Sequence, residues 1–162
     1  MEKYNYIYGM KRPWYTIYAL VDPKYPDVPR YIGFTDGNPV WRLGRHLGET
    51  WGLDSQKEAN LKQRWIRAIV GKGRVPKVKI IYQTKDGKRA TIAESILINY
   101  LFKGITNSTS IGDKTYKKRV NTKDGKLVLE RVHKKYKKLD PKFNDISLPD
   151  VYPGIFKGTR YE

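Results

Sequence analysis

Glu94 is the residue whose surroundings in the sequence most suggest chemistry. It is the only charged side chain in residues 92–102, and on a helix it shares a face with Leu97 and Leu101. A carboxylate among apolar side chains is costly unless it is paired or holds a cation such as Mg²⁺. The alternative is a capping box, in which Thr91 begins a helix and Glu94 only caps it. Glu94 is therefore either a cation ligand or a helix cap.

Arg42 and His46 form a second candidate pair. They are four residues apart, so on a helix both side chains can approach one ligand. A guanidinium suits phosphate, and an imidazole suits proton transfer near neutral pH. The alternative is a solvated helix face without a chemical role.

Tyr18 and Tyr31 lie in the segment YTIYALVDPKYPDVPRYIGFT, which is typical of two strands joined by a proline-rich loop. When the apolar alternate residues of both strands share one face, Tyr18 and Tyr31 meet on the other, more polar face, beside Gly33. A glycine there leaves room for a ligand or another stretch of backbone. The two tyrosines are either part of a site or only a cross-strand aromatic pair.

Asn107 and His133 carry weaker signals. Asn107 follows an expected helix in the segment ITNSTS, where asparagine is most simply a turn residue. His133 lies in a basic region, and we interpret it as a solvated side chain. Neither residue indicates a site by itself.

The first helix is expected to begin at Asn38-Pro39, a capping residue followed by proline, and to end at Gly48. Apolar residues at helical spacing predict one buried stripe, and polar residues predict a solvated stripe opposite it. The buried stripe is Val40, Leu43 and Leu47, and the opposite one is Arg42, Arg45, His46 and Glu49.

A second helix is expected over about 57–70, with its basic residues, including Lys62, facing outward. The alternating residues 77–84 predict a strand that ends in a turn at 85–88. This helix and this strand are the elements expected to pack beside the two strands of residues 15–35.

The third helix is expected to run from Thr91 to about Lys103, with Gly104 as its C-terminal cap. The pentapeptide TKDGK occurs at 84–88 and again at 122–126. Because Asp-Gly is a favoured turn pair, we interpret both copies as hairpin turns.

Composition limits the classes of function. The 162 residues suit one domain, and the absence of cysteine excludes a disulfide framework, a thiolate zinc site and a cysteine nucleophile. The start of the chain lacks the apolar run of a signal peptide, and no stretch is long enough to span a membrane. We therefore expect an intracellular, cytoplasmic protein without a membrane partner.

The charge indicates the class of partner. The 33 Lys and Arg exceed the 16 Asp and Glu, which leaves a net charge of +17. Residues 114–142 hold twelve basic and three acidic side chains, a net +9 of that total. An excess of this size predicts a polyanionic partner, although ribosomal-type proteins and membrane-surface segments share it.

In their order along the chain, these residues resemble the GIY-YIG nuclease family. The Tyr31-Ile32-Gly33 triplet is intact, whereas Thr16-Ile17-Tyr18 has Thr in place of the first Gly. The resemblance covers about residues 15–112 and also includes KQRWIRAIVGKGRVPKVKIIYQ and KGITNSTSIG. Its six matching site positions are Tyr18, Tyr31, Arg42, His46, Glu94 and Asn107.

The resemblance implies an α/β fold with a small three-stranded antiparallel sheet flanked by helices. A catalytic domain would cover 1–112, and a basic DNA-binding extension would cover 113–162. The implied activity is metal-dependent hydrolysis of DNA, double-stranded in this interpretation, with a homodimer as one way to cut both strands. Residues expected to hold DNA are Arg45, Lys117, Lys118, Arg119, Lys134, Lys135, Lys137 and Lys138.

The same resemblance implies roles for the site residues. Glu94 would hold one Mg²⁺ or Mn²⁺ per active site, and Arg42 would neutralise charge on the phosphoryl oxygens. Tyr18 would deprotonate the attacking water while Tyr31 positions it. His46 would either lower the pKa of the tyrosine or accept its proton. Asn107 would brace the site by hydrogen bonds.

Two other functions fit the composition. A nucleic-acid-binding protein could keep this fold without catalysis, although all six site positions are filled. A ribosomal-type structural protein would also be basic, but an isolated Glu94 on an apolar helix argues against it.

Overall fold

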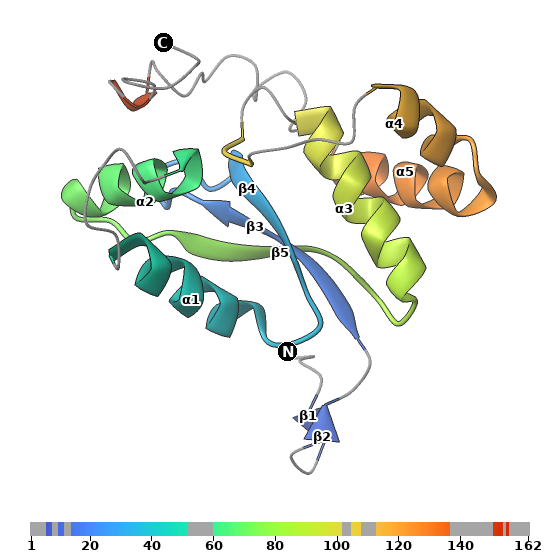
Figure 1. The fold of residues 1–162 in the computed structure, drawn as a ribbon, viewed down its shortest axis with the longest axis horizontal. Helices are drawn as coiled ribbons and strands as arrows, with labels where there is room; N and C mark the ends of the chain where they lie inside the picture. The colour runs from blue at the N-terminus through green and yellow to red at the C-terminus, as the bar shows by residue number, and fades with distance from the viewer. Residues whose placement is uncertain are drawn as a thin grey trace.

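A three-stranded antiparallel sheet forms the centre of the molecule in a computed structural model (Figure 1). Its strands are β3 (Tyr15–Val21), β4 (Pro29–Thr35) and β5 (Lys77–Thr84), in the order β4-β3-β5. The hairpin and the third strand predicted from the sequence are thus confirmed. The structure describes residues 6–7, 10–11, 14–51, 60–101, 105–107, 113–136, 151–153 and 155.

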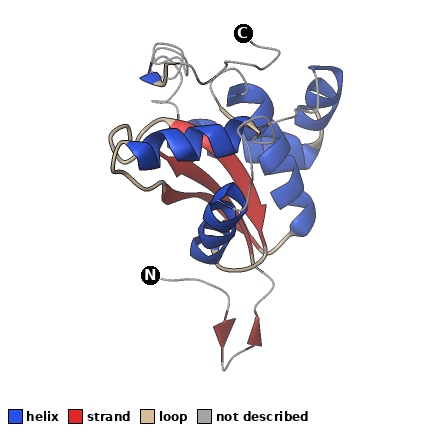
Figure 2. Cartoon of the chain, turned by 60° about the vertical axis from the view of Figure 1, so that its left-hand side comes forward, coloured by secondary structure: helices blue, strands red, loops and turns tan. Residues whose placement is uncertain are grey.

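Five helices flank the sheet, so the predicted fold class is confirmed (Figure 2). A separate two-stranded ribbon, β1 (Tyr6–Ile7) paired with β2 (Met10–Lys11), precedes the sheet. Within the described ranges, no helix combines the length and apolar composition needed to cross a membrane. The helices are α1 (Pro39–Trp51), α2 (Leu61–Gly71), α3 (Gly87–Leu101), α4 (Asp113–Val120) and α5 (Lys123–Tyr136).

The two faces of the sheet bury different cores. On one face, Ile17, Ala19 and Ile32 pack with Ile96 and other aliphatic residues of α3. The other face carries Tyr18, Leu20 and Tyr31 and packs against α1 and α2. The face expected to be more polar is therefore a second core, built around Trp65, Ile66 and Ile69 of α2.

Part of the basic C-terminal region belongs to this packed structure. Helix α5 packs against α3, and Val128 is fully buried in the same core as Ile96. Farther along the chain, Tyr152 and Ile155 are buried in the second core. Residues after 113 therefore contribute to stability as well as to the charge.

Capping residues explain where the first two helices begin. The Asn38 side chain accepts a hydrogen bond from the Val40 amide at 2.9 Å, which confirms the predicted start of α1. Helix α2 begins later than expected, because Asn60 and Gln63 form a reciprocal capping box in front of Leu61.

The interpretation of the two TKDGK segments was wrong, because both begin helices. In the first, Asp86 accepts a hydrogen bond from the Lys88 amide at 2.9 Å, and α3 starts at Gly87. In the second, Thr122 accepts from the Gly125 amide at 3.0 Å, and α5 follows. Asp and Thr side chains mimic a turn and cap a helix by the same hydrogen bond, so the sequence alone does not separate the two outcomes.

One predicted helix end also differs. Helix α1 continues through Gly48 to Trp51, since one glycine inside a packed helix costs only about 1 kcal/mol. Helix α3 is described to Leu101, and its expected end near Lys103 and cap at Gly104 lie outside the described residues.

Candidate active site

The first two strands place both tyrosines on one face of the sheet. Tyr18 pairs with Gly33, and Tyr31 pairs with Leu20, so the two tyrosines are diagonal neighbours rather than direct partners. Their ring centroids lie 6.5 Å apart. The predicted shared face is confirmed, while the register is shifted from direct opposition.

Gly33 is required by the position of Tyr18. A Cβ added at Gly33 would overlap the Tyr18 ring, which lies across this position. Because β4 is an edge strand, the ring reaches toward the border of the sheet. The room that the sequence predicted beside Gly33 is therefore occupied by a side chain of the site itself.

His46 is buried, which corrects its placement on a solvated helix face. It is 3% exposed, whereas Val40, predicted to be buried, is 55% exposed. The helix turns His46, Leu43 and Leu47 toward the sheet. There His46 Nε2 lies 2.8 Å from the Tyr18 hydroxyl, and its ring meets Tyr31 edge-on at 5.0 Å between centroids.

Lys62 is the site residue that sequence reasoning missed. It was expected to face outward from α2 but is 8% exposed, with Nζ 2.9 Å from His46 Nδ1. The ammonium also lies 5.1 Å from the Tyr31 ring centroid and 3.8 Å from a Glu49 carboxylate oxygen. Nothing in the helical pattern distinguishes Lys62 from solvated lysines, because a long basic side chain suits either environment.

Arg42 approaches the same tyrosine from α1. Its guanidinium lies close enough to the Tyr18 oxygen to oppose the effect of burial on the pKa of that tyrosine. Its Nε is buried and has no hydrogen-bond partner in the part of the chain that the structure describes. A buried donor without an acceptor costs about 1–3 kcal/mol, and a phosphate oxygen would satisfy it.

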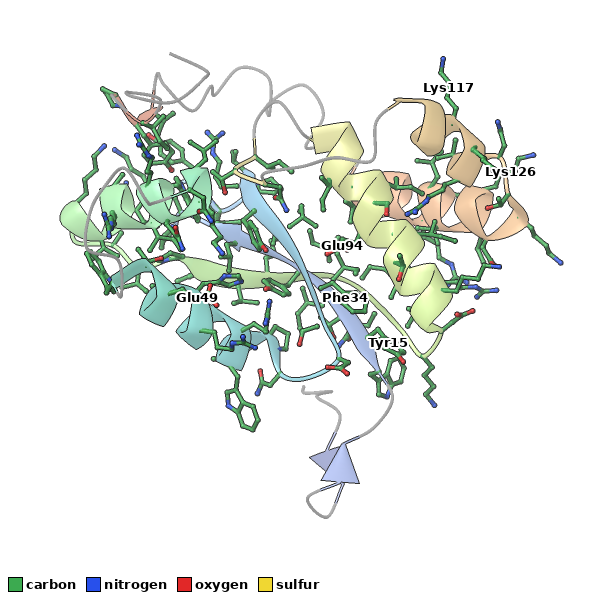
Figure 3. The ribbon with its side chains drawn as sticks, viewed as in Figure 1. Tyr15, Phe34, Glu49, Glu94, Lys117 and Lys126 are labelled. Carbon is green, nitrogen blue, oxygen red and sulfur yellow. The ribbon has the colours of Figure 1, made fainter. Side chains whose placement is uncertain are left out.

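Glu94 does not cap a helix. Helix α3 begins at Gly87, so Glu94 lies two turns inside it and the capping-box alternative is wrong. Figure 3 shows Glu94 on the side of α3 nearest β4. Burial is the main cause of the raised pKa of both Tyr18 and Tyr31, and the Glu94 charge adds to it, so the carboxylate lies within electrostatic range of the two tyrosines. Among the described residues, Glu94 makes no hydrogen bond or ion pair.

Asn107 lies on the outer edge of β4. Its amide accepts a hydrogen bond from the Ile32 N–H at 3.0 Å and donates one to the Ile32 carbonyl at 2.9 Å. Next to it, the Thr106 amide and hydroxyl both bond the Arg30 carbonyl. These contacts hold the backbone on both sides of Tyr31 and cover a strand edge that would otherwise be unpaired.

Burial and charge separate the roles of the titratable groups. Burial, followed by the charges of Lys62, Arg42 and Arg45, lowers the pKa of His46 to about 3, so the imidazole is neutral at pH 7. Burial raises the pKa of Tyr31 to about 12. It also raises the pKa of Tyr18, but there a hydrogen bond from Arg42 opposes the effect. Tyr18 is therefore the tyrosine whose ionised form receives direct support.

The donor set suits a single cation. Among the described residues, no three acidic or histidine side chains are grouped to hold a metal ion. Both nitrogens of His46 are engaged by Tyr18 and Lys62, so it is not a ligand. Burial raises the pKa of the unpaired Glu94 carboxyl, and a divalent cation would favour its ionised form. One carboxylate with phosphate and water oxygens is a usual Mg²⁺ set.

The residues expected to bind DNA differ in their surroundings. Arg45, Lys117 and Lys118 are exposed, and Figure 3 shows Lys117 pointing away from the molecule. Arg119 is half-buried and donates a hydrogen bond to Ser95. The structure does not describe the side chains of His133, Lys134 and Lys135. Lys137 and Lys138 lie entirely outside the described residues.

A hollow of about 530 Å³ lies between α3 and the helices α4 and α5. It is lined by Lys88, Arg119 and Lys123 together with Asp124, and it contains no residue of the candidate site. Sequence reasoning did not predict this basic hollow, because its residues come from three separate helices.

Comparison of the chain with family models, with curated protein sequences and with solved structures finds no match. Functional conclusions therefore depend on the geometry of the site.

Proposed function

We propose that the protein is a divalent-cation-dependent DNA endonuclease of the GIY-YIG type. The observation that carries the proposal is the convergence of Arg42 and Glu94 on the two tyrosines. Arg42 has a buried donor without a partner, and Glu94 has a carboxylate without one, in the part of the chain described. A phosphodiester bound with a cation would satisfy both groups at once.

Arg42 would bind the scissile phosphate and neutralise the charge that develops on its oxygens. In the DNA-free protein, Tyr18 is fully buried and Arg42 lies beside its oxygen. Turning of Arg42 toward the phosphate would therefore open the Tyr18 oxygen to solvent and to the attacking water. Tyr18 would first release its hydroxyl proton to solvent, and the tyrosinate would then accept the proton of the attacking water while Tyr31 positions that water.

Glu94 would hold Mg²⁺ or Mn²⁺ in this site. When bound, the cation would supply charge neutralisation at the phosphate and at the departing oxygen. Asn107 would fix Tyr31 through the backbone of Ile32. Exposed cations on α1 and α4, such as Arg45 and Lys117, would hold the DNA backbone without reading its sequence.

Incubation of the purified protein with supercoiled plasmid tests this proposal. We expect nicked and linear products with Mg²⁺, and none with EDTA. Glu94→Gln should abolish cleavage without lowering stability, because it removes a half-buried, unpaired carboxylate. Glu130→Gln, the same change at an exposed position on α5, should leave cleavage unchanged.

The alternative function is nucleic-acid binding on the same fold without catalysis. Plasmid binding in gel shifts, with no cleavage under Mg²⁺ or Mn²⁺, would support that alternative and contradict the nuclease. Equal cleavage by the wild type and Glu94→Gln would contradict the assignment of Glu94 as the cation ligand.

A further inference from the structure

A chain of contacts runs from the buried tyrosine to a buried lysine. The Tyr18 hydroxyl lies 2.8 Å from His46 Nε2, and His46 Nδ1 lies 2.9 Å from Lys62 Nζ. The three residues come from β3, α1 and α2, and all three are buried. Both ring nitrogens of His46 are thus occupied, and the donor in each contact depends on where the protons lie.

The charge on Lys62 decides which group is the donor in each of these two contacts. An ammonium has three donors and no lone pair, so it can only donate to His46 Nδ1. A neutral imidazole carries one proton, so that proton must then lie on Nε2. His46 therefore donates from Nε2 to the Tyr18 oxygen. The opposite arrangement, in which Tyr18 donates to His46, requires a neutral Lys62.

Two neighbours of Lys62 favour its charged form. The Glu49 carboxylate lies 3.8 Å from Nζ, and the face of the Tyr31 ring lies 5.1 Å away. Burial and the Arg42 charge act in the other direction and lower the pKa of Lys62 from an ordinary value of 10.5. The charged groups that face His46 are Lys62 on α2 and Arg42 and Arg45 on α1, all cations.

We propose that Lys62 is a positioning residue that holds His46 as a hydrogen-bond donor to Tyr18. Its ammonium fixes the proton of His46 on Nε2. The Tyr18 oxygen then receives a donor from His46, which stabilises its ionised form and would continue to do so after Arg42 turned to the phosphate. The kinetic part of this inference rests on the proposed nuclease function, whereas the protonation state of His46 does not.

This assignment chooses between two roles for His46. An imidazole whose proton is held on Nε2 has no lone pair facing Tyr18, so it does not accept the tyrosine proton. His46 instead stabilises the tyrosinate by donating a hydrogen bond, and the Lys62 ammonium holds the imidazole in the protonation state that this requires. Partners that orient a histidine in this way typically change activity by about 10- to 100-fold.

Nitrogen NMR of the DNA-free protein tests the protonation state directly. The chain has two histidines, so ¹⁵N-labelled His133→Gln protein leaves only the signals of His46. We expect a neutral ring protonated at Nε2 from pH 5 to 8. Lys62→Met should lose this preference, and Lys62→Arg, which keeps charged donors, should retain it. A proton on Nδ1 in the parent, or an unchanged pattern in Lys62→Met, would overturn the inference.

Single-turnover cleavage at saturating protein tests the consequence. Lys62→Met should be slower by about 10- to 100-fold, with Lys62→Arg recovering part of the rate. Lys77→Met, which removes an exposed lysine on β5, should keep the parent rate. Thermal unfolding should show Lys62→Met at least as stable as the parent, because it removes a buried charge.

The outcomes separate the two proposals. A wild-type protein that cleaves no DNA would contradict the nuclease function, while NMR still decides the state of His46. An active wild type with an equally active, folded Lys62→Met would overturn the role of Lys62 and leave the nuclease function standing.

Discussion

Two buried polar clusters border the α2 side of the sheet, and they differ in how completely their groups are paired. Asp22, at the end of β3, is fully buried and accepts two hydrogen bonds from Arg74, at 2.7 and 2.8 Å. It also accepts from the Tyr152 hydroxyl at 2.9 Å and from the Lys24 amide at 3.0 Å. In the candidate site, Arg42 Nε and the Glu94 carboxylate have no such partners within the described residues.

The pKa values reflect the same difference. Burial pushes the pKa of Asp22 upward, but hydrogen bonds from Arg74, Lys24 and Tyr152 outweigh it, so the net shift is downward. Burial acts on Glu94 without an opposing partner, and its pKa is raised. A complete cluster stabilises the fold, whereas an incomplete one is costly unless a ligand completes it. The absence of pairing partners therefore distinguishes the candidate site from the Asp22 cluster better than burial alone does.

The largest effect on stability should come from breaking the complete cluster. Asp22→Asn should lower the free energy of unfolding by about 1–3 kcal/mol, because one of the two oxygens that accept from Arg74 and Tyr152 is replaced by a donor. Chemical denaturation measures this loss, with Asp27→Asn, an exposed acid, as the control. The folded variant should keep its single-turnover cleavage rate. A large loss of rate without a loss of stability would show that this cluster takes part in the chemistry.

The stabilisation by Asp22 should depend on pH in a defined direction. Because its folded pKa lies below the ordinary value of 3.8, its contribution is present above that value. It should disappear as the pH falls through the folded pKa.

Breaking the incomplete cluster should have the opposite signature. Arg42→Ala should slow single-turnover cleavage by about 10²- to 10³-fold, the usual loss for a preorganised donor, with little loss of stability. Arg42→Lys should restore little, since an ammonium does not reproduce the guanidinium fork. Arg45→Ala, on the same helix, should weaken DNA binding modestly and leave the rate at saturation unchanged. Similar rates for the Arg42 and Arg45 variants would contradict the assignment.

The smallest effect should be the part of the pH dependence of stability that His46 contributes. Its folded pKa of about 3 lies below the unfolded value of 6.5, so the unfolded chain binds the extra proton between these values. Stability is therefore full above pH 6.5 and falls as the pH decreases toward 3. Between pH 6.5 and 5, the free energy of unfolding should fall by about 1.5 kcal/mol because of His46.

Denaturation of His46→Gln over the same range provides the test. This variant should lose that part of the pH dependence, since glutamine does not titrate. An equal dependence in both proteins would mean that folding does not shift the pKa of His46.

Local sequence determined most of the architecture, whereas the candidate site was assembled from the family resemblance and stays a prediction. The patterns at 15–35 and 77–84 specified all three central strands, because successive side chains of a strand point to opposite faces, although both faces are buried in the fold. Asn38 specified the start of α1, because its side chain bonds an amide two residues away. Of the six residues predicted as one site, Tyr18, Tyr31 and His46 are in mutual contact, and Asn107 holds the strand beside Tyr31.

Only the tertiary structure decided which side chains of these elements are buried, and what they contact. Lys62 and His46 have polar side chains that suit a solvated helix face, and only the packing of α1 on α2 brings them together beneath Tyr31. The sequence around Glu94 fits a capping box, but in the fold Asp86 caps the helix, and α3 begins at Gly87, two turns before Glu94. A helical pattern specifies which residues share a face, whereas the neighbouring elements specify whether that face meets water, an apolar core or another charge.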